Sequence, residues 1–300
     1  SKFAYVGLVA DTDVKTYLDY TQLNRHTLIA GGTGSGKTVA GMVVVEELIK
    51  RGTNVIVLDP VGQWTGFSNR NSDKIMSNRY RKFGISSPKA FPISIVEINK
   101  SNMNLDIHAY MSRKGLVVLK MSKLSPKDID LFVEQCLRRI YTADLAETSA
   151  LKSVIVLDEV HRILPKYGGK KAYVRLEQAV REFRKWGVGL LMISQVLTDF
   201  KGAIRGNIGT EIQLQTRYEG DIKRVRERSG TKISRLVSKL PVGLGIVECP
   251  SYNHGAPYFV EFRPLLHSPF KLTDPEIAKY AKKEKPILNA AEIIKKDKVP

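Results

Sequence analysis

Cysteine is nearly absent from this chain of 300 residues, which contains only Cys136 and Cys249. Two cysteines so far apart in sequence exclude a disulfide framework and a cysteine-based metal cluster, and such a composition suits a reducing compartment. Long apolar runs are also missing, because none approaches the ~18 residues that span a bilayer. No signal peptide is recognised at the start of the sequence. We therefore expect a cytoplasmic globular protein.

Acidic residues are scarce relative to basic ones. The chain has 48 Lys and Arg against 30 Asp and Glu, which gives a net charge of +18 and a pI near 9.8. The excess is concentrated, with eight basic and two acidic residues in 161–190 and ten and four in 201–240. This charge is typical of a nucleic-acid partner, although a solvated lysine-rich surface or an anionic membrane partner would give the same total.

Strand-like and helix-like segments alternate along the sequence. The apolar stretches of strand length are 3–9, 26–31, 54–60, 91–99, 115–121, 152–159, 188–195, 210–216 and 242–250. Helical periodicity marks 37–52, a segment that begins at a capping box of Ser125 and Asp128, 173–187, and a short stretch around 275–283. Residues 61–90 are polar and irregular. The alternation predicts an α/β fold with a mostly parallel sheet and helices on its faces.

Glycine is concentrated at one place, where four glycines occupy positions 31 to 36 and Lys37 and Thr38 follow at once. The pattern G-x-x-x-x-G-K-[ST] is the phosphate-binding P-loop, in which bare backbone N–H groups surround phosphate oxygens. Lys37 would reach the β- and γ-phosphates, and the Thr38 hydroxyl would bind Mg²⁺. A merely flexible loop is the alternative, but a strand before it and a helix after it favour the P-loop. The expected nucleotide-binding residues are Gly31, Gly32, Thr33, Gly34, Ser35, Gly36, Lys37, Thr38 and Val39.

An acidic pair, Asp158 and Glu159, ends the apolar stretch 152–159. Asp158 is the expected Mg²⁺ ligand, directly or through water, and Glu159 would polarise the attacking water. We expect their strand to lie next to the P-loop strand. Asp59 also ends an apolar run, but it lacks a second acid and precedes a proline, so we favour Asp158. The adjacent glutamate indicates hydrolysis rather than transfer to a bound metabolite, although residues 61–90 could be the lid of a kinase.

Gln195 ends the stretch 188–195. Such an amide can contact the γ-phosphate or orient the water, or it can simply cap the strand, and the residue alone does not decide between these roles.

The ordered set of motifs resembles the HerA/FtsK superfamily of hexameric DNA-pumping ATPases. The resemblance rests on "NRHTLIAGGTGSGKT", "VLDPVGQW", "DEVHRILP" and "REFRKWGVGLLMISQ", within residues 20–215. It implies a RecA-like P-loop NTPase core at residues 27–265, with an insertion at 61–150 that holds extra strands and a helix. A small N-terminal strand and lead-in at 1–26 and a C-terminal tail at 266–300 complete the expected organisation.

The resemblance also implies roles for individual residues. Lys37, Glu159 and Gln195 would be catalytic, with Gln195 as the sensor, and Arg184 would reach the γ-phosphate bound to a neighbouring subunit. Arg217 is the second choice for that arginine. In RecA-like rings the loops after the acidic pair and after the sensor strand face the pore. The basic residues of these loops, which we expect to contact DNA, are Lys166, Lys170, Lys171, Lys201 and Arg205.

These features together predict a DNA translocase motor that hydrolyses Mg²⁺·ATP at the subunit interfaces of a ring, expected to be a hexamer. Its partner would be duplex DNA or DNA bound without sequence preference, together with a nuclease or a membrane DNA-transfer protein that would place it at the edge of a membrane complex. Residues 1–26 are too few for the N-terminal β-barrel usual in HerA proteins, so the biological process stays open. The alternatives are a secretion or assembly ATPase that acts on protein, and a monomeric nucleotide switch or kinase.

Overall fold

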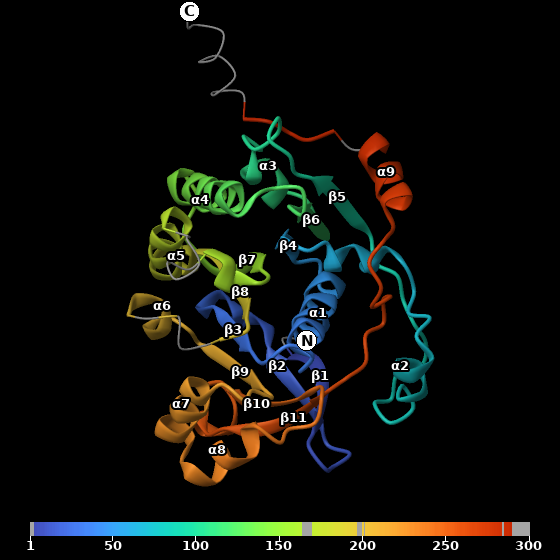
Figure 1. The fold of residues 1–300 in the computed structure, drawn as a ribbon, viewed down its shortest axis with the longest axis vertical. Coiled ribbons are helices and arrows are strands. Elements are labelled where there is room, and N and C mark those ends of the chain that lie inside the picture. Colours follow the sequence, from blue (N-terminus) through green and yellow to red (C-terminus); the bar gives the residue numbers. More distant parts are fainter. Residues whose placement is uncertain (1–2, 164–169, 197–199, 201, 284, 290–300) are drawn as a thin grey trace, which may run out of the picture.

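The computed structural model of the chain describes residues 3–163, 170–196, 200, 202–283 and 285–289. One sheet runs through it in the strand order β2-β1-β11-β10-β9-β3-β8-β7-β4-β6-β5 (Figure 1). From β9 to β5 all neighbouring strands are parallel, whereas β2, β1, β11 and β10 form an antiparallel extension next to β9. The predicted α/β class with a mostly parallel sheet is therefore confirmed.

The strands are short and mostly buried. They are β1 Phe3–Val9, β2 Lys15–Asp19, β3 Thr27–Ala30, β4 Asn54–Asp59, β5 Ile93–Glu97, β6 Leu116–Lys120, β7 Thr148–Leu157, β8 Trp186–Ser194, β9 Thr210–Leu214, β10 Leu244–Glu248 and β11 Tyr258–Phe262.

Helices connect many of the strands. The α-helices are α1 Lys37–Lys50, α2 Lys74–Asn78, α3 Ile107–Met111, α4 Pro126–Thr142, α5 Lys171–Glu182, α6 Ala203–Gly206, α7 Glu219–Ser229, α8 Thr231–Val237 and α9 Asp274–Lys283. Short 3₁₀ segments are η1 Tyr20–Arg25, η2 Gln63–Ser68, η3 Val160–Ile163, η5 Phe183–Lys185 and η6 Asn253–Gly255. At the start of α4 the capping box is confirmed, because Ser125 Oγ accepts from the N–H of Asp128 and donates to its carboxylate.

Helices cover both faces of the parallel strands. In β3, successive side chains point to opposite faces and enter two different cores. Leu28 and Ala30 point into a core shared with α4 and α5, whereas Ile29 points into the opposite core, shared with α1. All three residues are fully buried. Strands with two buried faces read as continuous apolar runs, which is why the sequence marks them so clearly.

Two findings refine the sequence analysis. The strand that precedes the acidic pair is not the neighbour of the P-loop strand, because β8 lies between β3 and β7; that expectation was wrong. The irregular segment 61–90 contains η2 and α2 and buries three aromatic side chains completely, namely Trp64, Phe67 and Phe83. Much of this segment is therefore part of the packed core rather than an open lid.

In the described part of the chain, no helix is both long and apolar enough to cross a membrane. Cys136 and Cys249 are both buried and free.

His26 holds the start of β3 in place. Its ring is 1% exposed, with Nε2 3.1 Å from the carbonyl oxygen of Val180 and Nδ1 accepting from the N–H of Leu190 at 3.0 Å. One nitrogen must donate and the other must accept, so the ring is neutral with its proton on Nε2. The pKa of His26 is lowered from 6.5 to about 4. Burial is the main cause, the nearby charge of Arg184 acts in the same direction, and the bond to Val180 opposes both.

This histidine predicts a pH dependence of stability. The folded-state pKa lies below the unfolded value, so its contribution to stability is complete above pH 6.5 and is lost as the pH falls from 6.5 to about 4. We expect this contribution, which is the difference in free energy of unfolding between the parent and His26→Gln, to fall by about 3 kcal/mol over this window, measured by urea unfolding at several pH values. The His26→Gln variant should lack most of this dependence, whereas the exposed control His254→Gln should keep it. Identical pH profiles for parent and His26→Gln would contradict the prediction.

Candidate nucleotide-binding and hydrolysis site

The P-loop connects β3 to α1 at the carboxyl end of the parallel strands. Gly34 and Gly36 have φ values of 77° and 95°, a region that disfavours residues with a side chain. At Gly31 an added Cβ would lie 2.4 Å from Ser35 Oγ. The loop is anchored on its outer side, because Gly32 N–H donates to the carbonyl of Gln215 at 2.7 Å and Gly243 N–H donates to that of Ser35 at 3.1 Å. These contacts fix the backbone of the loop against the residues after β9 and before β10.

Lys37 is the first residue of α1 and is 6% exposed. No acceptor or carboxylate among the described residues pairs with its ammonium group, although a buried charge normally has a partner. An anion held by the P-loop would supply that partner, and the free N–H groups at the start of α1 favour negative charge there. The buried ammonium and the side-chain-free loop thus fit a polyphosphate.

Asp158 follows β7 at the same edge of the sheet and is 4% exposed. Its Oδ2 accepts a hydrogen bond of 2.9 Å from the indole Nε1 of Trp64, a fully buried residue of η2. Burial raises the pKa of Asp158 to about 7, and the charges of Asp59 and Glu159 add to this rise while the bond from Trp64 opposes it. A cation beside this carboxylate would relieve the cost of its charge.

Asp59 has a different task in the structure. Its two carboxylate oxygens accept from the backbone N–H groups of Val61, Gly62 and Trp64, at 3.1, 2.7 and 2.9 Å. The side chain thus closes the turn between β4 and η2, which supports the choice of Asp158 over Asp59 as the metal-binding candidate.

Glu159 has a φ of 49°, an uncommon backbone conformation for a residue with a side chain. Its carboxylate lies between two polar groups, because Oε2 is 3.4 Å from Nε2 of Gln195 and 3.3 Å from Nδ1 of His161. Gln195 directly follows β8, the strand between β3 and β7. The structure therefore brings Glu159 and Gln195 into contact.

The donor set also fits a magnesium ion. Thr38 and Asp158 are oxygen donors, and Mg²⁺ usually takes only one or two protein ligands together with phosphate oxygens and water. The described residues contain no cluster of three or more His, Cys, Asp or Glu that could hold a metal without a nucleotide. Magnesium bound by Thr38 and Asp158 would neutralise phosphate charge and fix its position.

Sequence reasoning missed Trp64 and His161, which contact the two acids. Trp64 is 94 positions away from Asp158, and no local pattern links them. His161 could have been suspected, because it lies two residues after Glu159.

The two arginine candidates lie at opposite ends of the parallel strands, Arg184 before β8 and Arg217 after β9. Arg184, exposed in η5, precedes β8, whereas Gln195 follows it, so a strand of about 30 Å separates Arg184 from the phosphate-binding edge of its own chain. Arg217 is also exposed but lies two residues after Gln215, which anchors the P-loop. Arg184 therefore lies away from the phosphate-binding edge of its own chain.

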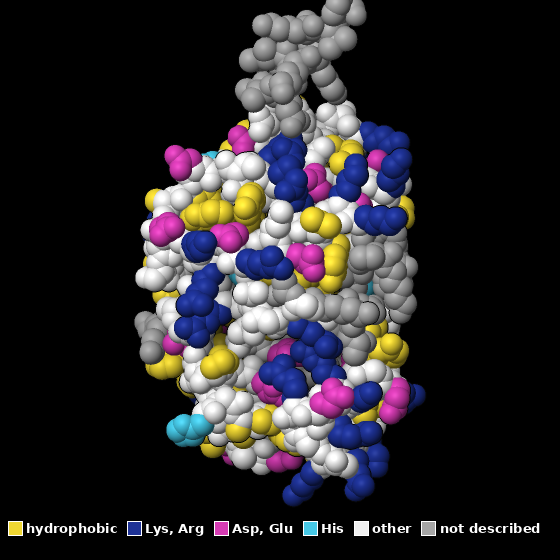
Figure 2. Space-filling model, turned by 90° about the vertical axis from the view of Figure 1, so that its left-hand side faces the viewer, with side chains coloured by type: hydrophobic (Ala, Val, Ile, Leu, Met, Phe, Trp, Pro, Cys, Tyr) yellow, Lys and Arg dark blue, Asp and Glu magenta, His cyan; other side chains and the backbone are white. Residues whose placement is uncertain are grey.

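Basic side chains gather on the face formed by α4, α5, α6 and α7. Figure 2 shows several groups of Lys and Arg there, with Asp and Glu between them. Lys170 and Lys171 are exposed at the start of α5, and Arg205 is half-buried in α6, which packs beside α5. Lys166 and Lys201, the other two expected DNA contacts, lie outside the described residues.

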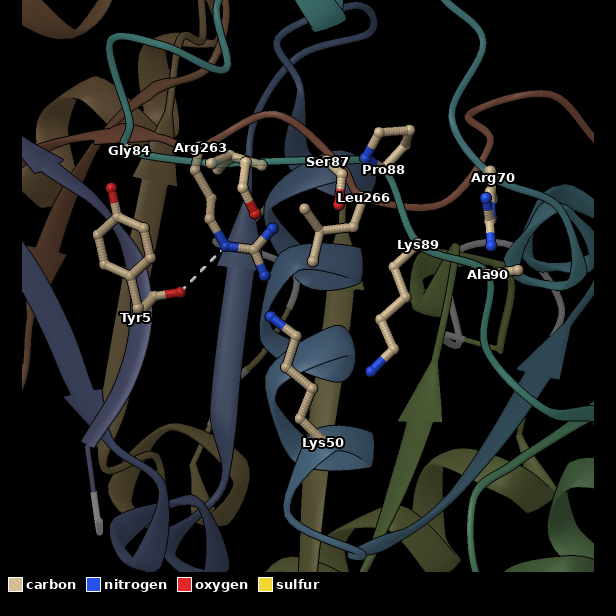
Figure 3. Close-up of a pocket in the computed structure, with 12 residues that line it drawn as sticks. Tyr5, Lys50, Arg70, Gly84, Ser87, Pro88, Lys89, Ala90, Arg263 and Leu266 are labelled. Atoms are coloured by element: carbon tan, nitrogen blue, oxygen red, sulfur yellow. Dashed lines mark hydrogen bonds between the residues drawn. The ribbon is translucent and has the colours of Figure 1, made fainter.

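A different cavity, of about 620 Å³, lies at the far end of α1 and has a basic lining (Figure 3). Two of its cations have carboxylate partners, because Lys50 pairs with Glu47 at 2.7 Å and Arg263 pairs with Glu46 and Glu47. The other two, Arg70 and Lys89, are exposed to solvent. This cavity therefore lacks the unpaired buried charge that marks the P-loop as the phosphate site.

The fold and the P-loop define a RecA-like P-loop NTPase. The chain belongs to the family described as "Helicase HerA, central domain", whose model matches residues 4–155. It is thus an ATPase of this family and, in general terms, an ATP-driven translocase motor. Comparison with curated proteins gave no significant match.

Solved structures of similar fold include VirB4 of Thermoanaerobacter pseudethanolicus, with 13% identity, a TM-score of 0.56 and coverage of 91% of this chain and 97% of that one. The cytoplasmic domain of the type VII secretion ATPase EccC of Thermomonospora curvata has 16% identity and a TM-score of 0.51, and the match covers 88% of this chain and 28% of that one. The pCW3 conjugation coupling protein TcpA, in a monomer form with ATPγS, has 16% identity, a TM-score of 0.50 and coverage of 95% and 71%.

The contact between Trp64 and Asp158 yields a prediction. Trp64→Phe keeps a ring in the core but removes the donor to Asp158, so the carboxylate loses the partner that orients it. We expect the Mg²⁺ concentration for half-maximal ATPase activity to rise roughly tenfold. Trp186→Phe, at the only other tryptophan, is the matched control and should leave this concentration unchanged. An unchanged Mg²⁺ requirement in a folded Trp64→Phe protein would argue against this role.

Proposed function

We propose that this protein is an ATP-driven DNA translocase that works as a ring, expected to be a hexamer, with Mg²⁺·ATP at each subunit interface and DNA in a basic central pore. The observation that carries the ring is the placement of Arg184 and Gln195 at opposite ends of β8. A subunit with its P-loop at one edge and its arginine at the other can complete a site only with a neighbour.

Each site residue receives a role in this proposal. The P-loop and Lys37 hold the phosphates, while Thr38 and Asp158 hold Mg²⁺. Glu159 accepts a proton from the attacking water, and its contact with Gln195 couples that water to the γ-phosphate. Arg184 of the adjacent subunit stabilises the charge that spreads over the γ-phosphate oxygens in the transition state.

DNA as the substrate is supported by charge. The net charge of +18 is accompanied by exposed Lys170 and Lys171 on the segment that leads away from Glu159. Contacts to the phosphate backbone need no sequence reading, which suits a motor. TcpA is a conjugation coupling protein, and its similar fold agrees with handling of DNA. EccC is a secretion ATPase, so a motor that moves protein is the second candidate.

The ring is tested by mixing variants. Glu159→Gln should bind ATP but lose hydrolysis, and Arg184→Ala should lose at least ~10³-fold in turnover, because each variant spoils a different half of a shared site. Mixed together, the two should recover ATPase activity, since some interfaces then combine an intact Glu159 with an intact Arg184. Steady-state phosphate release measures both effects.

Lys185→Ala, which removes the neighbouring exposed cation, is the control and should stay active. Parent-like turnover by Arg184→Ala would exclude the shared site and favour a monomeric nucleotide switch or kinase.

DNA as the substrate is tested by stimulation of ATPase activity. Duplex DNA should stimulate hydrolysis at low salt, and this effect should fall steeply with added salt because counterions compete for the phosphates. Lys171→Ala should raise the DNA concentration for half-maximal stimulation roughly threefold or more. Lys74→Ala removes another exposed lysine at the first position of a helix, in α2, and should not change this concentration. Absence of stimulation at low salt would favour the protein-moving alternative.

A further inference from the structure

A second cavity adjoins the P-loop. Its volume is about 590 Å³, and Thr38 and Val39, the two residues after Lys37, form part of its wall. One turn further along α1, Met42 continues this wall. The opposite side consists of residues from the turn after β4 and from the C-terminal segment 265–271; they are Val61, Gln63, Leu265, Pro269, Phe270 and Lys271.

The walls are mainly apolar and include an aromatic ring. Phe270 is 58% exposed, which is unusual for a phenylalanine in a chain that buries Phe67, Phe83 and Phe91. Polar side chains occur at Gln63 and Lys271. A cavity with apolar walls and a few polar groups, open to solvent on one side, is typical of a site for part of a small molecule.

Buried charges hold the C-terminal segment against α1. Arg263, 1% exposed, donates from Nη1 to Glu46 at 2.7 Å and from Nη2 to Glu47 at 3.0 Å. The other oxygen of Glu46 accepts from the N–H groups of Leu266 and His267 and contacts Nδ1 of His267 at 2.6 Å. Burial alone would raise the pKa of Glu46, but these partners outweigh it and lower the pKa to about 2.

The same segment is held on its other side by η2 and the residues just after it. Leu272 N–H donates to Thr65 Oγ1 at 2.9 Å, and Ser268 N–H donates to the carbonyl of Asn69 at 2.9 Å. Gly66 packs so closely that an added Cβ would lie 2.4 Å from the carbonyl oxygen of Ser268 and 2.5 Å from that of Phe270. Figure 1 shows the segment passing beside α1 toward α9. Phe270 is therefore an exposed ring on a fixed backbone.

We propose that this cavity binds the base and ribose of the nucleotide, with the ring of Phe270 against the base. The inference rests on the proposed placement of the phosphates on the P-loop. With the γ-phosphate facing Glu159 and Gln195, the rest of the nucleotide leaves the loop at its other end, beside the backbone of Thr38 and Val39. The cavity begins there, and its apolar walls suit the faces of a purine. A ring that is already held in place loses little entropy when the base binds.

The test separates the base from the phosphates by comparing two ligands, ATP and inorganic tripolyphosphate, each measured by equilibrium competition against a fluorescent nucleotide. Phe270→Ala should weaken ATP binding roughly tenfold, the usual effect of removing an aromatic ring from a stacked base. Tripolyphosphate has no base, so its affinity should not change. Phe3→Ala, at another exposed phenylalanine, which does not line this cavity, is the control and should affect neither ligand.

Further variants distinguish a failure of the base site from a failure of the phosphate site. Phe270→Trp retains a stacking surface and should bind ATP as tightly as the parent. Unchanged ATP affinity in Phe270→Ala, an equal loss for both ligands, or a loss in Phe270→Trp as large as in Phe270→Ala would each overturn the base site. Lys37→Ala addresses the phosphate site itself and should weaken both ligands. If Lys37→Ala bound both as well as the parent, the proposed function would fail instead.

Discussion

The parallel direction of β3, β8 and β7 is the constraint on which the site depends. Because parallel strands end at the same edge, the P-loop after β3, Gln195 after β8 and Asp158 with Glu159 after β7 meet although they are far apart in sequence. Backbone hydrogen bonds fix the register of these strands, with Ala30 opposite Ser194 and Leu157 opposite Met192. The side chains that follow are thereby brought close enough for contacts such as those of Glu159 with Gln195 and of Trp64 with Asp158.

Among the described residues, buried charges are unpaired at the carboxyl end of the parallel strands, whereas those that join α1 to the C-terminal segment are paired. Lys37 is buried without a partner among the described residues, and Asp158 is buried beside two other carboxylates. By contrast, Glu46, Arg263 and His267 form a buried network with every charge paired. Unpaired buried charges and uncommon backbone conformations are both typical of ligand-binding sites, and Glu159, with a φ of 49°, lies at the same edge.

The sequence predicts the P-loop residues in full because the glycine pattern is local and each position has a backbone reason. It also predicts Asp158 and Glu159, since an acidic pair after an apolar strand is readable within ten residues. The order of the strands cannot be read from local sequence in this way, because it depends on pairing between distant segments. The expected adjacency of β3 and β7 was wrong. Trp64, which contacts Asp158, and Phe270, which shares a cavity with Val39, are placed by tertiary packing alone.

Strand β8 is buried along nearly its whole length and is bonded on both sides, to β3 and to β7. A strand held in this way neither bends nor stretches by much, so its two ends move as one body. In a ring, one end would touch the nucleotide of its own subunit and the other the nucleotide of the next. Strand β8 would then keep a constant distance between its contacts with two consecutive sites. A change at one site would reach the next as a displacement of this strand rather than as a change of fold.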